Sequence, residues 1–386
     1  MVYTDSAEAG GPGAVSVDPT ARGLGDGPRR RQGPPRILQP GYAAAMITDL
    51  RLERWRGMKK ANVAGLTGIT ILAGPNSCGK SSILEGLVIA AGSSPGDAVG
   101  RVVKRRYESW SGARWLFTGG AEEGATATAT ATASGSEGES AATLTWHDGQ
   151  PPYDGLTPQG GAPFSWIETV LAVGTARRNA VTAFAGGDAY RFTQSGSAPA
   201  SARARLVDGL GRTREPLHRV VSRAIETDRI TDVDRIVHRL SGGLLSDVRI
   251  ATEEPEKPVV YVRRNGGAVP ISVAGDGIIS LVRLACELSA PTGSVVLLEE
   301  PECSLHARAI WELTEVIAAA HASGVQVVLT THSETLIDFL ILHDELRDVL
   351  SLHACALSHQ ELTIRRAEGA EVRHLAVEVM RRLLSE

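Results

Sequence analysis

A glycine-rich segment between residues 74 and 82 has the residue types and the spacing that bind phosphate. The run GPNSCGKS matches the pattern GxxxxGK[ST], and an apolar segment precedes it and a helix-like segment follows it. Glycines let the backbone turn tightly, so successive N–H groups can point at phosphate oxygens, and the helix start adds its positive dipole end. We expect Lys80 to contact the β- and γ-phosphates of ATP and the Ser81 hydroxyl to bind Mg²⁺. The candidate nucleotide-binding residues of this loop are Gly74, Asn76, Ser77, Cys78, Gly79, Lys80, Ser81 and Ser82.

Two carboxylates follow a very apolar segment later in the chain. Val295–Leu298 leads directly into Glu299 and Glu300. A buried strand that ends in acids beside a phosphate loop places a metal-side carboxylate next to a water-activating one. We therefore expect Glu299 to face Mg²⁺ through water, and Glu300 to act as the general base. The alternative is a core strand that meets a solvated turn.

A histidine follows a second apolar run. Val325–Thr330 precedes Thr331, His332 and Ser333. A histidine at the end of a strand can reach a γ-phosphate oxygen, and we expect this catalytic role for His332. A capping or packed imidazole is the alternative.

Other charged residues give weaker signals. Arg101–Trp115 mixes cations with aromatics, which is typical of contact with nucleic acid, although an amphipathic hinge has the same composition. Arg56 is a candidate for contact with phosphate or adenine, with strand packing as the alternative. Arg177 and Arg178 are candidates for contact with a partner or a nucleotide, but plain surface charge is the favoured interpretation.

The thiol of Cys78 has an unusual position, two residues before Lys80. A thiol at a helix N-terminus beside an ammonium group has its thiolate favoured, so we expect it to be reactive and protected by ATP. The alternative is that its side chain turns into the protein.

These residues need a fold that brings several strand ends together. The pattern predicts strands from Met46 to Trp55 and at Ile69–Leu72, and helices at Ile83–Ala91, Gly277–Ser289 and Trp311–Ala322. Further predicted elements are helix-like stretches at Ser165–Val173 and Leu217–Leu240 and strands at Val248–Ala251, Val259–Arg263, Val269–Ser272, Val295–Leu298 and Val325–Thr330. Strands that alternate with helices indicate an α/β fold with a largely parallel sheet.

The chain divides into three regions by composition. Residues 1–45 are rich in Gly, Pro and Ala without periodicity, so we expect a disordered extension that activity does not need. Residues 46–386 form the predicted ATPase domain, with a helical lobe and a β-rich insertion at about 99–245. The ATATATAT run inside that insertion fits a strand or a loop equally well.

Bulk properties exclude several classes of protein. The 386 residues are 42% hydrophobic and 22% charged with a net charge of −4, the balance of a soluble globular protein rather than of a wholly basic nucleic-acid binder. The sequence has no apolar run of membrane length and no signal-peptide core. Its four cysteines form no CxxC pair, which argues against a zinc site or a disulfide framework and favours the cytoplasm.

The motifs, in this order, resemble the ABC-type ATPases. They are more similar to the bacterial AAA-family ATPases of the overcoming-lysogenisation-defect (OLD) type, relatives of the SMC and RecF-like heads. The resemblance covers Met46–Ala91 and Ile271–Leu340, and it rests on MITDLRLERWRGM, GPNSCGKSSILEGL, ISVAGDGIISLVRLA, LLEEPECSLHA and LTTHSETLID. It implies a P-loop NTPase fold, ATP and Mg²⁺ as cofactors, and a head-to-tail homodimer. In that dimer Gly275, Asp276 and Gly277 would replace the ABC signature and contact ATP held by the second subunit.

The sequence departs from this pattern at several points. Glu299 stands where ABC proteins usually have Asp, and Ala274 precedes Gly275, so the usual signature serine must be Ser272 or absent. The Gln loop is not placed, because Gln150 and Gln159 are only weak candidates. We also see no toprim nuclease pattern after the histidine motif.

The resemblance favours an ATP-hydrolysing switch that acts on nucleic acid or with a partner effector such as a nuclease, in phage defence or DNA repair. A transporter subunit is the alternative, but the sequence lacks LSGGQ and has a long gap between Lys80 and Glu299. A scaffold that binds ATP without hydrolysing it ranks lower, since both Glu299 and Glu300 are present.

Overall fold

The computed structural model describes the chain from Met46 to Leu383 with gaps. The described residues are 46–106, 110–119, 126–153, 156, 165–184, 190–197, 203–208, 215–254, 257–264, 266–273, 275–303 and 305–383. They lie in the second of two units, Met1–Ile37 and Leu38–Glu386. The predicted extension at residues 1–45 falls outside them.

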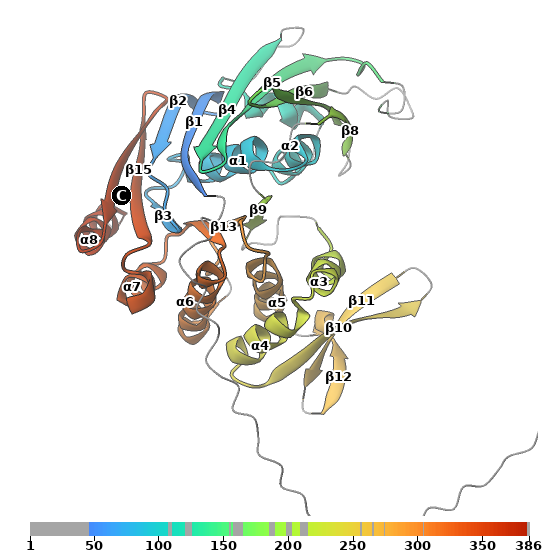
Figure 1. The fold of residues 1–386 in the computed structure, drawn as a ribbon, viewed down its shortest axis with the longest axis vertical. Coiled ribbons are helices and arrows are strands. Elements are labelled where there is room, and N and C mark those ends of the chain that lie inside the picture. Colours follow the sequence, from blue (N-terminus) through green and yellow to red (C-terminus); the bar gives the residue numbers. More distant parts are fainter. Residues whose placement is uncertain are drawn as a thin grey trace, which may run out of the picture. The chain divides into compact units, whose positions relative to one another are not determined.

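Thirteen of the strands join one sheet, and most helices pack on it (Figure 1). The strands are β1 (Ile47–Trp55), β2 (Met58–Ala64), β3 (Ile69–Ala73), β4 (Ala127–Gly135), β5 (Gly138–Asp148), β6 (Ser165–Val173), β7 (Ala176–Phe184), β8 (Tyr190–Gly196), β9 (Arg203–Asp208), β10 (Leu245–Glu254), β11 (Lys257–Arg264), β12 (Gly267–Pro270), β13 (Ser294–Glu299), β14 (Gln326–Thr330), β15 (Leu350–Ser358) and β16 (Glu361–Glu368). The helices are α1 (Lys80–Ala91), α2 (Pro95–Lys104), α3 (Leu217–Glu226), α4 (Ile230–Leu240), α5 (Asp276–Leu288), α6 (Ala307–Ala322), α7 (Glu334–Leu342) and α8 (Glu371–Leu383), with 3₁₀ turns η1 (Trp110–Leu116), η3 (Ile271–Val273) and η4 (Asp344–Leu346).

The large sheet has a parallel end and an antiparallel end. Its order is β8-β7-β6-β5-β4-β1-β2-β16-β15-β3-β14-β13-β9. Strands β15, β3, β14, β13 and β9 run parallel to one another, whereas β16 pairs antiparallel with β15 and strands β1, β2 and β4 to β8 pair antiparallel with one another. The predicted parallel sheet is therefore this one end, which carries both the phosphate loop and the acidic strand. The short hairpins of the other end allow only antiparallel pairing.

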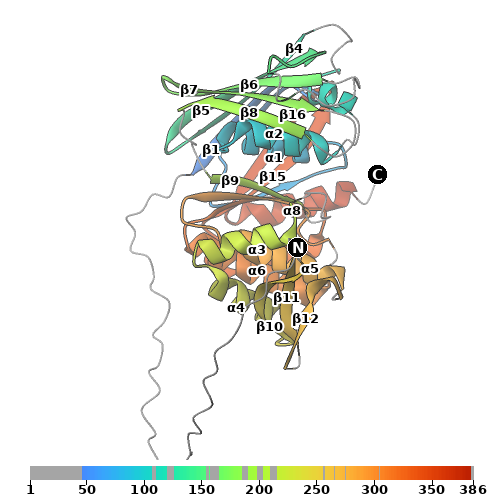
Figure 2. The same ribbon diagram turned by 90° about the vertical axis from the view of Figure 1, so that its right-hand side faces the viewer.

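Helix α1 lies between the two ends of the sheet (Figure 2). Its core cluster joins apolar residues of β1, β4, β5 and β6 to Val295, Leu297 and Val328 of the parallel end. Every residue of α1 except Ser81 is buried. A helix that is apolar on all sides must be covered on all sides, and here both ends of one sheet cover it.

The opposite face of the parallel strands forms a second core. Ile69, Ile71, Val296 and Leu298 pack there with apolar residues of α5, α6, α7 and α8. A third cluster joins α3, α4 and α5 to the small sheet β10-β11-β12 and forms the helical lobe. The functional strand ends thus lie between two well-packed layers.

One predicted helix was wrong, and another is divided in two. Ser165–Val173 is strand β6, and its side chains alternate between buried and partly exposed, the period of a strand rather than of a helix. Leu217–Leu240 is two helices, because Asp228 adopts a left-handed φ of 56° and turns the chain between them. The predicted strand Val269–Ser272 ends at Pro270 and continues as the 3₁₀ turn η3.

The ATATATAT run forms strand β4, which pairs with β1 and β5. Ala129, Ala131 and Ala133 are buried, while the threonines between them are partly exposed. The predicted insertion therefore continues the main sheet through β4 to β8, and β9 joins the opposite edge. The boundaries of the insertion, about 99–245, stay a prediction.

None of the helices within the described ranges is long and apolar enough to cross a membrane.

Candidate nucleotide-binding site

The phosphate loop connects β3 to α1, as the motif predicts. Gly79, directly before the helix, has a φ of +97°, and Gly74 has a φ of +147°. A Cβ at Gly74 would come within 2.3 Å of the Cys355 carbonyl oxygen, so only glycine fits there. Strand β15 therefore fixes the start of the loop.

Lys80 is held inside the loop. Its Nζ donates hydrogen bonds to the carbonyls of Gly74 and Pro75, each at 2.7 Å, and its side chain is buried. The ammonium group is thus placed at the centre of the loop before any phosphate arrives. This is the position that the sequence predicts for a phosphate-binding lysine.

A cavity of about 200 Å³ opens beside the loop. Strand ends and turns that are far apart in the sequence meet there. The residues that line it are Arg56, Gly57, Met58, Asn76, Ser77, Cys78, Gly79, Lys80, Ser81, Ser82, Arg106, Glu300, His332 and Leu357. Two arginines and a lysine give it the charge that a triphosphate needs, and Ser81 places a hydroxyl in it. The lining therefore fits a nucleoside triphosphate.

Glu300 and His332 lie together at this cavity. The Oε1 atom of Glu300 is 3.5 Å from Nε2 of His332, and the backbone N–H of Glu300 donates to the Thr330 carbonyl at 3.0 Å. Burial, with a further contribution from Lys80, lowers the pKa of His332, although Glu300 acts in the opposite direction. The imidazole is therefore neutral at pH 7 and can either donate or accept a hydrogen bond.

Glu299 has a different environment from the one the sequence predicts. Its carboxylate forms an ion pair with Arg105, and its Oε1 lies 3.7 Å from Nη2 of Arg106. In the described part of the chain, no group of three or more His, Cys, Asp or Glu side chains forms a metal site. The metal-side role of Glu299 stays a prediction, and it requires that Arg105 release the carboxylate.

A buried carboxylate in α1 organises the arginines. Glu85 is fully buried, and Arg56, Arg105 and Arg106 all pair with it, at 2.5, 2.8 and 2.8 Å. Burial by itself would raise the pKa of Glu85, but the three arginine charges lower it to about 2. The signal in the sequence was a lone glutamate inside the apolar run ILEGLVIAA, and it was missed.

Glu302 is a second carboxylate that the sequence reasoning missed. Its Oε1 accepts hydrogen bonds from the Thr331 hydroxyl at 2.5 Å and from the His332 backbone N–H at 3.2 Å. Burial raises its pKa. Glu302 thus fixes the turn that carries His332.

Asp208 ends strand β9 beside the acidic strand. It is the parallel partner of Glu299 in the sheet, and its carboxylate lies 3.9 Å from Arg105. Of the two weak Gln-loop candidates, Gln150 is exposed and does not line the cavity, and Gln159 lies outside the described residues. The Gln loop stays unplaced.

The Gly275–Gly277 segment lies away from the phosphate loop within this chain. Gly275 precedes the first residue of α5, and both Gly275 and Gly277 line a separate cavity of about 420 Å³ near His306 and Arg308. Neither lines the phosphate cavity. Contact with ATP of a second subunit stays a prediction.

The proposed nucleic-acid segment is mostly committed to internal ion pairs. Lys104 and Arg105 are buried, and Arg101 pairs with Asp97 and Glu215. Lys104 and Arg105 are thus not exposed for such contact, and nucleic-acid contact by the rest of the segment stays a prediction. Trp115 is exposed, with the Arg114 guanidinium 4.8 Å from its ring centre, and Tyr107 lies outside the described residues.

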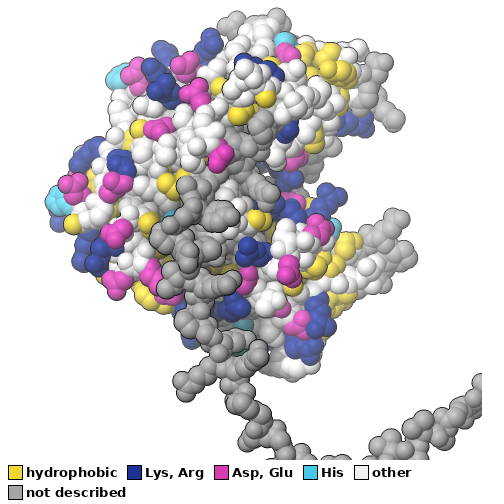
Figure 3. Space-filling model, viewed as in Figure 1, with side chains coloured by type: hydrophobic (Ala, Val, Ile, Leu, Met, Phe, Trp, Pro, Cys, Tyr) yellow, Lys and Arg dark blue, Asp and Glu magenta, His cyan; other side chains and the backbone are white. Residues whose placement is uncertain are grey.

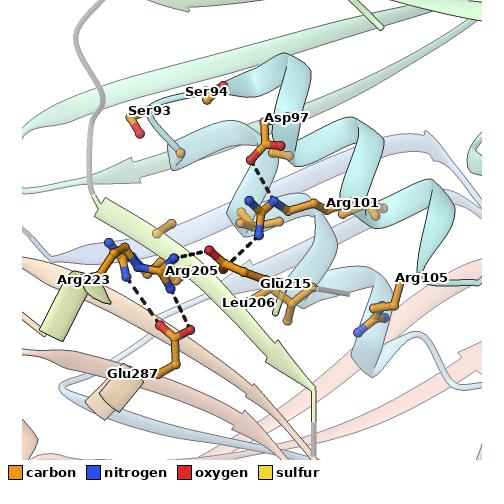
Figure 4. Close-up of a pocket in the computed structure, with 15 residues that line it drawn as sticks. Ser93, Ser94, Asp97, Arg101, Arg105, Arg205, Leu206, Glu215, Arg223 and Glu287 are labelled. Carbon is orange, nitrogen blue, oxygen red and sulfur yellow. Dashed lines mark hydrogen bonds and ion pairs between the residues drawn. The ribbon is translucent and has the colours of Figure 1, made fainter. Parts of the chain in front are cut away.

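The ion pairs of Arg101 extend into a second cavity (Figure 4). This cavity, of about 220 Å³, lies between α2, β9, α3 and α5. Arg101, Arg205 and Arg223 alternate there with acidic side chains. Since the charges compensate one another, we read this cluster as a link between the helical lobe and the sheet.

On the side of the molecule that Figure 3 shows, Lys and Arg side chains are interspersed with Asp and Glu, so no large basic patch forms there. Arg177 and Arg178 donate hydrogen bonds to backbone carbonyls of Gly174, Ala176 and Ser93. Their interpretation as surface charge agrees with these contacts.

Comparisons with known proteins add a family match. Residues 191–338 match the family described as "AAA domain, putative AbiEii toxin, Type IV TA system". No curated protein matches the chain.

Several solved structures are similar to this one. An SMC head domain from Thermotoga maritima is 14% identical with a TM-score of 0.39, and the alignment covers 83% of this chain and 99% of that one. An SMC head bound to the C-winged helix domain of ScpA is 14% identical with a TM-score of 0.46, covering 85% and 99%. An SMC head with an extended coiled coil, bound to the C-terminal domain of ScpA derived from Pyrococcus furiosus, is 13% identical with a TM-score of 0.44, covering 88% and 99%.

The phosphate loop lies between β3 and α1, and the acidic strand β13 is two places from β3 in the sheet. The strand order and the phosphate loop together give an α/β fold of the P-loop NTPase type, and residues 191–338 match the AAA-domain family.

Proposed function

We propose that this protein binds ATP at the phosphate loop and hydrolyses it as a molecular switch. The observation that carries the proposal is the single cavity in which Lys80, Arg56, Arg106, Glu300 and His332 converge. Three cations there match a triphosphate, and a carboxylate beside a neutral imidazole matches the activation of water.

Each of these side chains has a distinct role in the proposed reaction. Lys80 and the loop N–H groups hold the β- and γ-phosphates, and Arg106 stabilises charge on the transferred group. Glu300 accepts a proton from the attacking water, and His332 holds a γ-phosphate oxygen by donating from its neutral ring. Mg²⁺, when bound with ATP, would neutralise phosphate charge, with the Ser81 hydroxyl as its ligand and Glu299 after release from Arg105.

The direct test of nucleotide binding is calorimetry with Mg-ATP. Lys80→Ala removes the ammonium at the centre of the loop, so we expect affinity to fall at least roughly 100-fold. Lys60→Ala, on the exposed side of β2, is the matched control and should bind as the wild type does. Equal affinity in both variants would show that the loop is not the ATP site.

We further propose that ATP brings two copies together head to tail. In such a dimer Gly275, Asp276 and Gly277 at the start of α5 would face the ATP of the other copy. Sedimentation velocity with and without ATP tests this step, using the Glu300→Gln variant, which should bind ATP but hydrolyse it slowly. A Gly277→Arg variant should bind ATP as a monomer, and an unchanged dimer would contradict this interface.

The downstream partner is proposed to be nucleic acid or a protein effector in the cytoplasm. The family description names a toxin of a type IV toxin–antitoxin system, which favours an effector in phage defence over transport. Stimulation of ATP hydrolysis by DNA or RNA would support the first partner. Co-purification with a nuclease or toxin would support the second, and co-purification with a permease would favour the transporter alternative.

A further inference from the structure

Two cysteines that are far apart in the sequence meet beneath the phosphate loop. Cys78 lies in the loop, and Cys355 lies in β15, which runs beside β3 with Ala354 opposite Ala73. Both belong to the same buried cluster, and the Cys355 thiol donates a hydrogen bond to the His353 carbonyl oxygen at 3.6 Å. Both side chains are buried, although Cys78 also lines the phosphate cavity, so the expected reactivity of Cys78 stays a prediction.

Gly74 makes room for this pair. A Cβ at Gly74 would lie 3.1 Å from Cys78 Sγ and 2.3 Å from the Cys355 carbonyl oxygen. The backbone of the loop therefore passes against both cysteines. Any covalent change between them acts directly on the loop that is proposed to hold phosphate.

The two sulfur atoms differ in their charge state. The neighbouring Cys355 thiol lowers the pKa of Cys78 to about 6; burial opposes this shift, and Lys80, with Nζ 3.8 Å from the sulfur, adds to it. The neighbouring Cys78, together with burial, raises the pKa of Cys355. At neutral pH the pair is thus a thiolate beside a thiol, the arrangement of an attacking and a resolving cysteine.

Each of the two cysteines borders a cavity. Cys78 lines the phosphate cavity, and Cys355 lines another cavity of about 200 Å³ together with Gly74 and Pro75. The other two cysteines are less suited to oxidation, because burial raises the pKa of Cys286 to about 12 and that of Cys303 to about 11.

We propose that Cys78 and Cys355 form a reversible oxidation site whose substrate is a small peroxide. The Cys78 thiolate attacks hydrogen peroxide, the O–O bond breaks, and the products are Cys78 sulfenic acid and hydroxide. The Cys355 thiol then displaces the sulfenic hydroxyl as water, so a disulfide forms and the two thiols have lost two electrons to the peroxide. A dithiol reductant reverses the step.

The disulfide ties the phosphate loop to strand β15. This consequence rests on the proposed function, because the tied loop can no longer rearrange around phosphate and ATP binding should be lost. Bound ATP should in turn shield Cys78 from peroxide. The disulfide itself does not depend on the proposed function.

The test uses the full chain treated with hydrogen peroxide at pH 7. Peptide mapping without reduction should find Cys78 joined to Cys355, and a dithiol should restore both thiols. Cys355→Ser should instead accumulate Cys78 sulfenic acid, which dimedone traps, because the resolving thiol is gone. Cys286→Ala, which removes a buried cysteine elsewhere, is the matched control and should form the disulfide normally.

Two readouts separate this inference from the proposed function. If the Cys78–Cys355 peptide forms but oxidation leaves ATP affinity unchanged, the regulatory consequence is overturned while the oxidation site stands. If oxidation instead falls on Cys303 or Cys286, or if Cys78 in Cys355→Ser is not trapped by dimedone, the oxidation site itself is overturned. Neither result depends on whether the protein hydrolyses ATP.

Discussion

Glu85 is the charge on which the arginines around the phosphate cavity depend. It is fully buried in α1 and compensates Arg56, Arg105 and Arg106. Two of these arginines line the cavity, so Glu85 acts on the site without touching it. Removing one partner of a buried ionic cluster leaves uncompensated charge in the core.

Glu85→Gln should therefore destabilise the protein by about 3–5 kcal/mol. Urea unfolding at pH 7 measures this, with Asp344→Asn in the exposed pair Asp344–Arg347 as the control, which should cost less than about 1 kcal/mol. A small effect in both would mean that solvent or other groups already compensate the arginines.

The pKa of Glu85 also determines the direction in which the free energy of unfolding changes with pH. Its folded pKa of about 2 lies below the ordinary value of 4.5, so its stabilising contribution is complete above pH 4.5 and is lost as the pH falls through 2. The difference in unfolding free energy between wild type and Glu85→Gln should shrink over that window. A difference that does not change on acidification would contradict the depressed pKa.

Glu300 is the residue on which proposed hydrolysis depends. Glu300→Gln keeps the shape of the side chain but cannot accept the proton from water, so we expect hydrolysis to slow by roughly 10²–10⁴ while ATP still binds. Single-turnover hydrolysis and calorimetry check the two halves of this statement. Normal hydrolysis would move the base to Glu299 or His332.

At the scale of elements, strand β4 shows how a sequence of low complexity becomes a core strand. Its alanines point toward α1 and its threonines away from it, and small side chains allow the helix to pack closely. The pattern has period two, but it lacks the bulky apolar face that marks most strands. Backbone pairing with β1 and β5 on either side holds this segment as a strand, although its own side chains do not favour one strongly.

Ala131→Asp should destabilise the fold by about 3 kcal/mol or more, because it buries an unpaired carboxylate against α1. Thr132→Asp, one residue along on the other face, should cost less than about 1 kcal/mol. Thermal unfolding of both variants compares the faces. Equal losses would show that β4 does not hold this register.

At the scale of the whole molecule, one sheet serves two purposes. Its antiparallel end curls over α1, and its parallel end brings the phosphate loop, Glu300 and His332 to one edge. The described fold begins at Met46, whose backbone N–H donates to the Ser136 hydroxyl at 2.9 Å, and β1 starts at the next residue.

A chain that starts at Met46 should therefore fold and bind ATP as the full chain does. Circular dichroism melts and calorimetry of the two chains test this, and we expect melting temperatures within about 2 °C of each other. Loss of folding or of ATP binding on truncation would show that residues 1–45 contribute to the domain.

The sequence by itself determined what depends on short spacing. The loop at Gly74–Ser82 and the acids after Val295–Leu298 are local patterns, and the strands and helices beside them have clear apolar runs. Tertiary structure decided what depends on distant partners. Ser165–Val173 forms a strand because β5 and β7 flank it. Glu299 pairs with Arg105, which directly follows α2. Cys78 lies near Cys355 because β15 lies beside β3. Sequence spacing carries no information on such pairs, because their energies arise only once the chain has closed the loops between them.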